Sequence, residues 1–339
     1  MSSQKSQLTF IVPLDFSRRG LDIYKRAIRL ADFFERNEIY ISFGINENSK
    51  YAKFIMSKYI NSNFVKFGIS NSKVINLSAL RNIALQKVNT PYVVFLDVDI
   101  FMDDDSLNII INSNLNRGMN IFPCLYLTKK SNSYILKKNR LEMINLYYSY
   151  RRDLFLHLAF PSFVMVCDFA SLKEIDFFDE FYLNHGYEDF DLIIRVMIHK
   201  GFFDNDSLSL KNNKYRSIAE MSGYRLSIAK YFLDNVAEDK FLFHIYHEKN
   251  KGDVYYSDCN KNYFVKKIKT HLDSFNTSKN EFNDNFYIVF RHYCMSKKIN
   301  MEKYSVFFDP MPGHMWRCFG FGDYMRKKIN TIFRRFKSY

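Results

Sequence analysis

Two hydrophobic periodicities alternate along the first third of the chain. Short apolar runs rich in β-branched and aromatic residues predict strands at 8–13, 39–43, 64–67 and 92–96. Between them, apolar residues recur at helical spacing and predict helices at 21–34, 50–60 and 79–88, with Ser78 as the cap of the third. The buried stripe expected on the first helix is Leu21, Tyr24, Ile28, Ala31 and Phe34. This alternation predicts an α/β fold with a mainly parallel central sheet flanked by helices.

The pattern continues less regularly to about residue 250. It predicts helices at 104–115, 141–158 and 188–200, and strands at 120–127 and 163–167. Gly201 is the expected end of the helix at 188–200. Beyond residue 250 the sequence becomes rich in Lys, Asn and Tyr and loses this rhythm. We therefore expect one large domain over 1–250 and a helical, basic C-terminal extension over 251–339.

Composition limits the class of protein. The chain has 339 residues, of which 47% are hydrophobic, enough to bury a large core. Its five cysteines are scattered without a CxxC pair, which disfavours a disulfide framework and favours a reducing compartment. The N-terminal residues lack the features of a signal peptide, and no apolar run approaches the ~20 residues that a membrane span needs. A cytoplasmic protein is expected.

The formal net charge of +13 makes an anionic partner plausible. Nucleic acid is not expected, because the basic residues do not interleave with aromatic ones on a recognisable element. Residues 323–339 instead predict a basic amphipathic helix, with Met325, Ile329, Ile332, Phe333 and Phe336 on one stripe. Such a helix can lie on an anionic membrane surface, here the cytoplasmic face of an inner membrane. The alternative is a terminal helix that packs on its own core.

A pair of carboxylates, Asp97 and Asp99, directly follows the predicted strand at 92–96. Two like charges so close together are costly unless a positive charge lies between them. Oxygen ligands suit Mg²⁺ or Mn²⁺, and substrate phosphates commonly complete such a site. The carboxyl end of a strand in a doubly wound sheet is also where ligands bind. A strand that ends in a polar turn, with Asp99 as a helix cap, remains the alternative.

A second acidic group, Glu188, Asp189 and Asp191, crowds the first turn of the helix predicted at 188–200. The helix dipole stabilises negative charge there, so charge complementation alone could explain one of these acids. Three acids in four residues exceed that need, and an ionised carboxylate can accept a proton from a hydroxyl.

Two histidines, His244 and His247, are three residues apart in the segment FLFHIYHEK. Either could reach a shared metal ion from a helix face or from the end of a strand. A single histidine is more often structural than a ligand, so this pair gains weight only from the acidic motifs that precede it.

Together, DVD, GYEDFD and HxxH resemble the glycosyltransferases of the GT-A fold over roughly residues 8–250. The resemblance is to β-1,4-galactosyltransferases and to bacterial capsule or lipopolysaccharide glycosyltransferases of the chondroitin polymerase type. It implies a Rossmann-like fold and metal-dependent, inverting transfer of a hexose or N-acetylhexosamine from a UDP-sugar. The acceptor would be a hydroxyl of a growing surface polysaccharide or lipid-linked glycan, and the cofactor Mn²⁺ or Mg²⁺.

The resemblance also implies roles for individual residues. Asp189 is the expected general base, with Glu188, Asp191, Tyr187 and Gly186 at the acceptor sugar. The expected metal ligands are Asp99, His244 and His247, where His244 stands in place of the methionine of the galactosyltransferases. The expected nucleotide-sugar contacts are Pro13, Asp15, Arg18 (or Arg19), Arg81, Asn82, Asp97 and Val98. His185-Gly186-Tyr187 replaces the family's Trp-Gly-Gly, and Ala84 replaces a glycine.

Two other readings of the motifs remain open. A phosphatase of the haloacid dehalogenase type also ends a strand in DxD. It prefers Thr or Val two residues after the second Asp, where Phe101 stands here, and usually carries the motif on its first strand. A sugar-nucleotide-binding protein without catalytic activity would share every motif with an enzyme.

Overall fold

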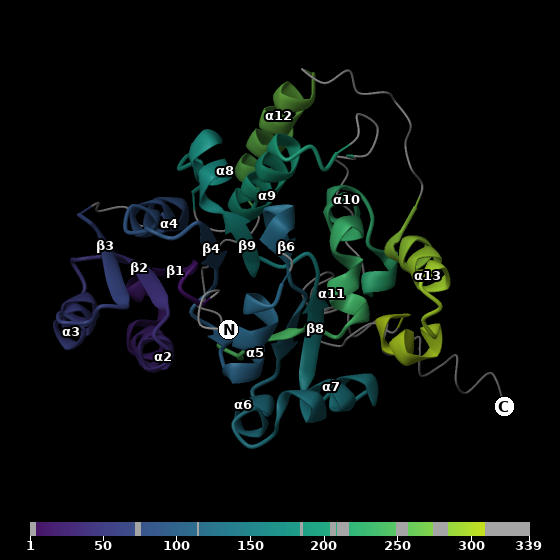
Figure 1. The fold of residues 1–339 in the computed structure, drawn as a ribbon, viewed down its shortest axis with the longest axis horizontal. Helices are drawn as coiled ribbons and strands as arrows, with labels where there is room; N and C mark the ends of the chain where they lie inside the picture. The colour runs from purple at the N-terminus through teal and green to yellow at the C-terminus, as the bar shows by residue number, and fades with distance from the viewer. Residues whose placement is uncertain are drawn as a thin grey trace. The chain divides into compact units, whose positions relative to one another are not determined.

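A computed structural model describes residues 5–71, 76–113, 115–183, 186–203, 208, 217–248, 257–273 and 284–308 (Figure 1). The chain forms two compact units. Unit 1 comprises Met1–Phe122, Ser162–Leu208 and His247–Asn280. Unit 2 comprises Pro123–Pro161, Ser209–Tyr246 and Glu281–Tyr339. The chain passes between the units several times, and the boundary predicted at residue 250 stays a prediction of where the large domain ends.

Unit 1 contains a six-stranded sheet in the order β3-β2-β1-β4-β9-β6. The strands are β1 (Leu8–Leu14), β2 (Tyr40–Asn46), β3 (Val65–Ser70), β4 (Tyr92–Phe95), β6 (Met119–Ile121) and β9 (Met165–Asp168). β1 runs parallel to β2 and β4, and β2 runs parallel to β3. β9 is antiparallel to both of its neighbours, β4 and β6. The predicted mainly parallel sheet is therefore confirmed.

Helices cover both faces of the parallel part of this sheet (Figure 1). Helix α4 (Leu77–Leu85) approaches β2 and β3 so closely that a Cβ on Gly44 would lie 1.8 Å from the Leu80 carbonyl oxygen. Helix α2 (Phe16–Arg36) packs on the opposite face, where Phe34 contacts Phe10 of β1. The other helical elements of unit 1 are α3 (Lys50–Lys58), α5 (Asp104–Ile111), η1 (Leu115–Arg117), α8 (Phe169–Glu174), α9 (Glu188–His199) and α12 (Asp258–Asp273), and a short strand, β5, covers Ile100–Phe101.

Unit 2 contains strands β7 (Cys124–Leu127), β8 (Phe155–Ala159) and β10 (Leu242–His244). β7 lies between β10, to which it is parallel, and β8, to which it is antiparallel. The helical elements are α6 (Ser131–Tyr134), α7 (Arg140–Tyr148), η2 (Ile218–Glu220), α10 (Tyr224–Ala229), η3 (Lys230–Phe232), α11 (Leu233–Ala237), α13 (Phe286–Ser296) and η4 (Met301–Phe308). Aromatic side chains fill the core, with Tyr147 packed against Phe155, Phe241 and Phe307.

Two predicted elements are wrong in extent. The strand predicted at 120–127 is two strands, β6 and β7, because Pro123 lacks the N–H that a continuous ladder needs. The helix predicted at 141–158 ends at Tyr148, and strand β8 begins at Phe155. Tyr150, with φ of 58°, lies in the left-handed region and ends the helical path. Aromatic residues at helical spacing concealed this turn.

Smaller corrections concern helix ends and faces. Asn76, not Ser78, caps α4 by accepting hydrogen bonds from the backbone N–H groups of Ser78 and Ala79. On α2, Leu21 is 52% exposed, and the buried face is formed by Ile23, Ala27, Leu30, Ala31 and Phe34. Tyr24 instead contacts Tyr51 of α3, with ring centroids 5.7 Å apart. The helix predicted at 104–115 ends at Ile111, whereas the helix predicted at 188–200 is confirmed as α9, followed by Gly201 with φ of 68°.

The basic amphipathic helix predicted at 323–339 lies outside the described residues. Its membrane contact and its packing on the core therefore both stay predictions. Among the helices that the structure does describe, none combines the length and the apolar character needed to cross a bilayer.

Candidate functional site

The Asp97–Asp99 motif lies at the carboxyl end of β4, as predicted. It forms a tight turn in which the Ile100 N–H donates to the Asp97 carbonyl oxygen at 3.0 Å. The neighbouring strand β1 ends at the same edge and leads directly into α2. The chain adds β2 and β3 on one side of β1 and then returns to place β4 on the other side. The motif at the end of β4 therefore lies where the strand order reverses, which is the usual ligand-binding point of a doubly wound sheet.

Three cationic or imidazole groups surround the Asp99 carboxylate, whose side chain is only 7% exposed. Arg19 Nη2 lies 2.7 Å from Oδ2, and Arg26 Nη1 lies 2.9 Å from Oδ1. His247 Nε2 lies 3.4 Å from Oδ2. A carboxylate buried to this degree needs such compensation to remain ionised.

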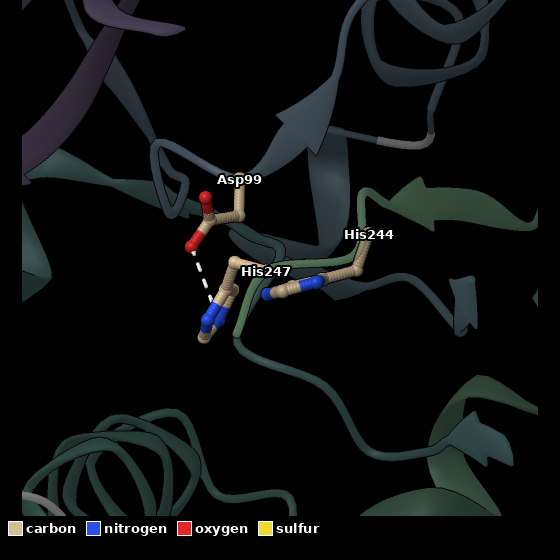
Figure 2. A group of neighbouring side chains, drawn as sticks. All are labelled: Asp99, His244 and His247. Carbon is tan, nitrogen blue, oxygen red and sulfur yellow. Dashed lines mark ion pairs between the residues drawn. The ribbon is translucent and has the colours of Figure 1, made fainter. Parts of the chain in front are cut away.

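The HxxH motif brings a second imidazole beside this pair (Figure 2). His244 ends β10, and only two residues separate it from His247. Asp99, His244 and His247 each offer one ligand atom, and these atoms lie within 4.8 Å of one another. The His244 ring stacks on Tyr126 with centroids 4.0 Å apart, and Tyr126 stacks in turn on His157. The stack fixes the plane of the His244 ring.

This donor set fits a divalent transition metal. One carboxylate and two imidazoles suit a first-row divalent transition metal better than Mg²⁺, which prefers oxygen ligands alone. The ring of His247 retains 19% exposure, so one side of the group faces solvent. A substrate oxygen could complete the coordination from that side.

Arg81 connects the first acidic motif to the second. It is 3% exposed, and its guanidinium lies 3.4 Å from both Asp97 Oδ1 and Glu188 Oε1. The ring of Phe163 lies 4.4 Å from the guanidinium carbon, within the range of a cation–π contact. Asp97 and Glu188, which come from two distant segments of the chain, therefore share one buried cation.

Asp97 differs from Asp99 in its surroundings. Its side chain is 42% exposed, yet partial burial raises its pKa above the usual value. Nearby Arg81 opposes that rise, while the carboxylates of Asp99 and Asp189 add to it. The two acids of the motif are thus distinguishable: Asp99 is enclosed by positive groups, and Asp97 faces the acids of α9.

The start of α9 separates its three acids by burial. Gly186 and Tyr187 both have positive φ, 111° and 77°, which turns the chain sharply into the helix. Glu188 is buried and accepts a hydrogen bond from the Gly186 N–H at 2.7 Å. Asp191 is fully buried, whereas Asp189 is only half-buried. Asp189 is the acid of this turn with most access to a substrate.

Asp191 belongs to a buried ionic cluster. Its Oδ2 lies 2.8 Å from Arg195 Nε and 3.1 Å from Lys267 Nζ. Arg195 also donates to the carbonyl oxygens of Ile175 and Phe177. In this structure Asp191 therefore has no exposed surface for an acceptor sugar, and its acceptor role stays a prediction.

The cluster predicts a stability effect. Asp191→Ala should lower the free energy of unfolding by about 3 kcal/mol, because it leaves the buried Arg195 without its carboxylate partner, while Lys267 keeps Asp179 at 2.6 Å. Urea unfolding followed by circular dichroism measures this. Asp104→Ala is the matched control, because Asp104 is an exposed acid in the first turn of α5 and should cost less than about 1 kcal/mol. An equal loss of unfolding free energy in Asp191→Ala and Asp104→Ala would contradict the claim that the buried ion pairs of Asp191 stabilise the fold.

The remaining predicted nucleotide contacts have local structural partners. Asp15 caps α2 by accepting from the Ser17 N–H at 3.0 Å. Asn82 Nδ2 donates to the Phe178 carbonyl oxygen and to Glu180 Oε1. Pro13 is buried in β1 opposite Gly44, and Val98 is 6% exposed. The Arg18 side chain lies outside the described residues, as does His185, so the nucleotide roles stay predictions.

Sequence reasoning missed Arg26, Arg29 and Asp22. Asp22 accepts hydrogen bonds from Arg19 Nη1 at 2.6 Å and from Arg26 Nε at 2.9 Å. Arg29 donates to the Ile100 carbonyl oxygen, and burial together with nearby Arg26 lowers its pKa to about 10. A signal was available, because these residues and Arg19 recur at the three- to four-residue spacing of one helix face.

Comparisons with known proteins show which proteins the chain resembles. No curated protein matches the chain. Solved structures that resemble it include Staphylococcus aureus TarS 1–349, with a TM-score of 0.41, 14% identity, and coverage of 92% of this chain and 81% of that one. Drosophila β1,4-galactosyltransferase 7 with xylobiose has a TM-score of 0.32 and 14% sequence identity to this chain. A mannosyltransferase from Pyrobaculum calidifontis with GDP-Man and Mn²⁺ has a TM-score of 0.37 and 12% identity.

Coverage differs among these similar structures. The alignment with the Drosophila enzyme covers 58% of this chain and 62% of that enzyme. The alignment with the mannosyltransferase covers 58% of this chain and 53% of the mannosyltransferase. The chain thus spans less than two thirds of either enzyme. The sequence profile described as Glycosyltransferase like family 2 matches residues 9–270, which is more than half of the chain. With its mainly parallel sheet flanked by helices, the chain has the GT-A type of fold and belongs to glycosyltransferase like family 2.

Proposed function

We propose that this protein is a metal-dependent, inverting glycosyltransferase. It moves a hexose or N-acetylhexosamine from a UDP-sugar to a hydroxyl of a growing surface polysaccharide or lipid-linked glycan. The observation that carries the proposal is the position of Asp99, at the carboxyl end of β4, 3.4 Å from His247. The link from Asp97 through Arg81 to Glu188 supports it, because it brings the second acidic motif to the same place.

In this proposal each side chain has a separate task. Asp99 and His247, with His244 beside them, hold a divalent cation, which neutralises charge on the leaving diphosphate when it is bound. Asp189 accepts the proton of the attacking hydroxyl at one carboxylate oxygen. Glu188 fixes the turn from which Asp189 projects, because it receives the Gly186 N–H. A single displacement at the anomeric carbon inverts its configuration and needs no covalent intermediate.

A panel of donors tests the proposal. UDP-Gal, UDP-GlcNAc and GDP-Man are bound in the similar structures and form a suitable set. We expect Mn²⁺-dependent binding and slow hydrolysis of a UDP-sugar, with binding of GDP-Man weaker. Binding without hydrolysis, or without transfer to any offered glycan, would favour a non-catalytic sugar-nucleotide-binding protein. Release of phosphate from phosphorylated substrates without sugar transfer would favour a phosphatase.

The place of action is also part of the proposal. Lipid-linked acceptors lie at membrane surfaces, and the basic residues of 323–339 would attract the chain to the cytoplasmic face of an inner membrane. Binding to vesicles with and without anionic lipid measures this attraction. Binding that does not respond to anionic lipid would contradict it.

A further inference from the structure

The contacts of Asp99 contain a conflict that concerns cation binding. Both of its oxygens are already approached by guanidinium groups: Arg19 contacts Oδ1 at 3.2 Å and Oδ2 at 2.7 Å, and Arg26 contacts Oδ1 at 2.9 Å. A divalent cation binds a carboxylate oxygen at roughly 2.0–2.3 Å, closer than either guanidinium. A dication and two guanidinium groups cannot all lie against one carboxylate without strong repulsion.

We propose that Arg19 and Arg26 act as exchangeable counter-ions of Asp99, and we call this pair the latch. A divalent cation must displace both guanidinium groups from the Asp99 carboxylate, and the donor's diphosphate then pairs with the displaced guanidinium groups. The inference rests on the proposed function for the identity of the donor. The chemistry that it requires is only a divalent cation and a polyanion, exchanged for two guanidinium groups. Arg19 and Arg26 are positioning residues in this scheme, because they act through Asp99.

Asp22 makes the exchange feasible. It already receives Arg19 Nη1 at 2.6 Å and Arg26 Nε at 2.9 Å, so both arginines remain paired when they leave Asp99. Asp22 is 44% exposed, whereas Arg19 and Arg26 are 16% and 12% exposed. A guanidinium group that moves from Asp99 toward Asp22 therefore moves toward solvent, where a phosphate oxygen can reach it. Arginine suits this task because its planar fork can form two parallel hydrogen bonds to a carboxylate or to a phosphate.

The latch couples two binding events. Without donor, the cation must displace guanidinium groups from a buried carboxylate, so its affinity is low. With donor, the diphosphate pairs with the displaced guanidinium groups, so cation and donor bind more tightly together than separately. Linkage requires that each raises the affinity of the other by the same factor, typically about 5- to 150-fold. Removing a guanidinium group should strengthen cation binding in the absence of donor and weaken the coupling.

The test measures Mn²⁺ binding directly, by electron paramagnetic resonance of the free ion, with and without UDP. For Arg26→Gln we expect Mn²⁺ affinity without UDP to rise about fivefold or more, and the enhancement by UDP to fall by a similar factor. Arg26→Lys keeps the charge without the planar fork and should lie between the wild type and Arg26→Gln. Lys25→Gln is the control, because it removes one exposed positive charge from the same helix and should change neither quantity.

The outcomes separate the latch from the proposed function. Unchanged or weaker Mn²⁺ binding by Arg26→Gln, with a thermal unfolding midpoint like that of the wild type, would overturn the latch. So would the absence of Mn²⁺ binding in every variant. If Mn²⁺-dependent sugar transfer by the wild type persists in either case, the proposed function stands. If the wild type binds Mn²⁺ with latch behaviour toward inorganic diphosphate but binds no UDP-sugar, the proposed function fails while the latch remains.

Discussion

Asp189→Asn should lower the rate of sugar transfer by about 10²- to 10⁴-fold, the usual contribution of a general base. The amide has nearly the shape of the carboxylate and can still accept from the Phe190 N–H, which Asp189 Oδ1 receives at 2.8 Å. It cannot take a proton from the acceptor hydroxyl. Donor binding should stay within about twofold of the wild type, because removal of a base affects the transition state and not the ground state.

Transfer kinetics and equilibrium binding of the donor together test this prediction. Asp105→Asn is the control, since Asp105 is an exposed acid in the first turn of another helix, α5, and should leave both quantities unchanged. Transfer by Asp189→Asn at a rate close to that of the wild type would rule out Asp189 as the base. The base would then have to be sought among the other acids near Arg81, of which Asp97 is the more exposed.

Removal of either predicted metal ligand should abolish the effect of Mn²⁺ on donor binding. For Asp99→Asn we expect the Mn²⁺-dependent part of UDP affinity to fall at least ~100-fold, because changes outside the ligand sphere alone cost 10- to 100-fold at metal sites. For His247→Gln the loss should be about tenfold or more, since one ligand is lost while the carboxylate stays. Calorimetric titration of UDP with and without Mn²⁺ measures both.

The two variants control for each other. Asp99→Asn also leaves Arg19 and Arg26 without a buried counter-ion, so it should lower the thermal unfolding midpoint. His247→Gln leaves those ion pairs intact and should not. If both variants bind UDP with the same Mn²⁺ dependence as the wild type, the cation does not lie at Asp99.

The sheet and the positions of the acidic motifs could be predicted from the sequence, because each depends on a pattern within a short segment. Alternating strands and helices determined the parallel sheet, and the position of Asp97 and Asp99 directly after β4 placed them at its ligand-binding edge. The acids of α9 were predicted from a helix start that the structure confirms. In each case the spacing along the chain was enough, because the relevant geometry extends over one turn or one strand.

The rest depends on contacts between distant segments. Nothing near Asp191 in the sequence indicates that Lys267 pairs with it, because Lys267 lies 76 residues further along the chain, in α12. The link from Arg81 to Glu188 likewise spans 107 positions. The spacing of the charged face of α2 was visible, but not that this face meets Asp99. Burial is what distinguishes the three acids of α9, and only tertiary packing determines it.

The central claim is that a divalent cation binds at Asp99 and His247 and also binds the diphosphate of the donor. Anomalous diffraction at the manganese edge from crystals grown with Mn²⁺ and UDP tests it most directly. The account predicts a single strong peak about 2.0–2.3 Å from an Asp99 carboxylate oxygen and from His247 Nε2, with the diphosphate bound to the same ion. UDP bound in full with no manganese peak at Asp99, or with the peak at another set of residues, would contradict it.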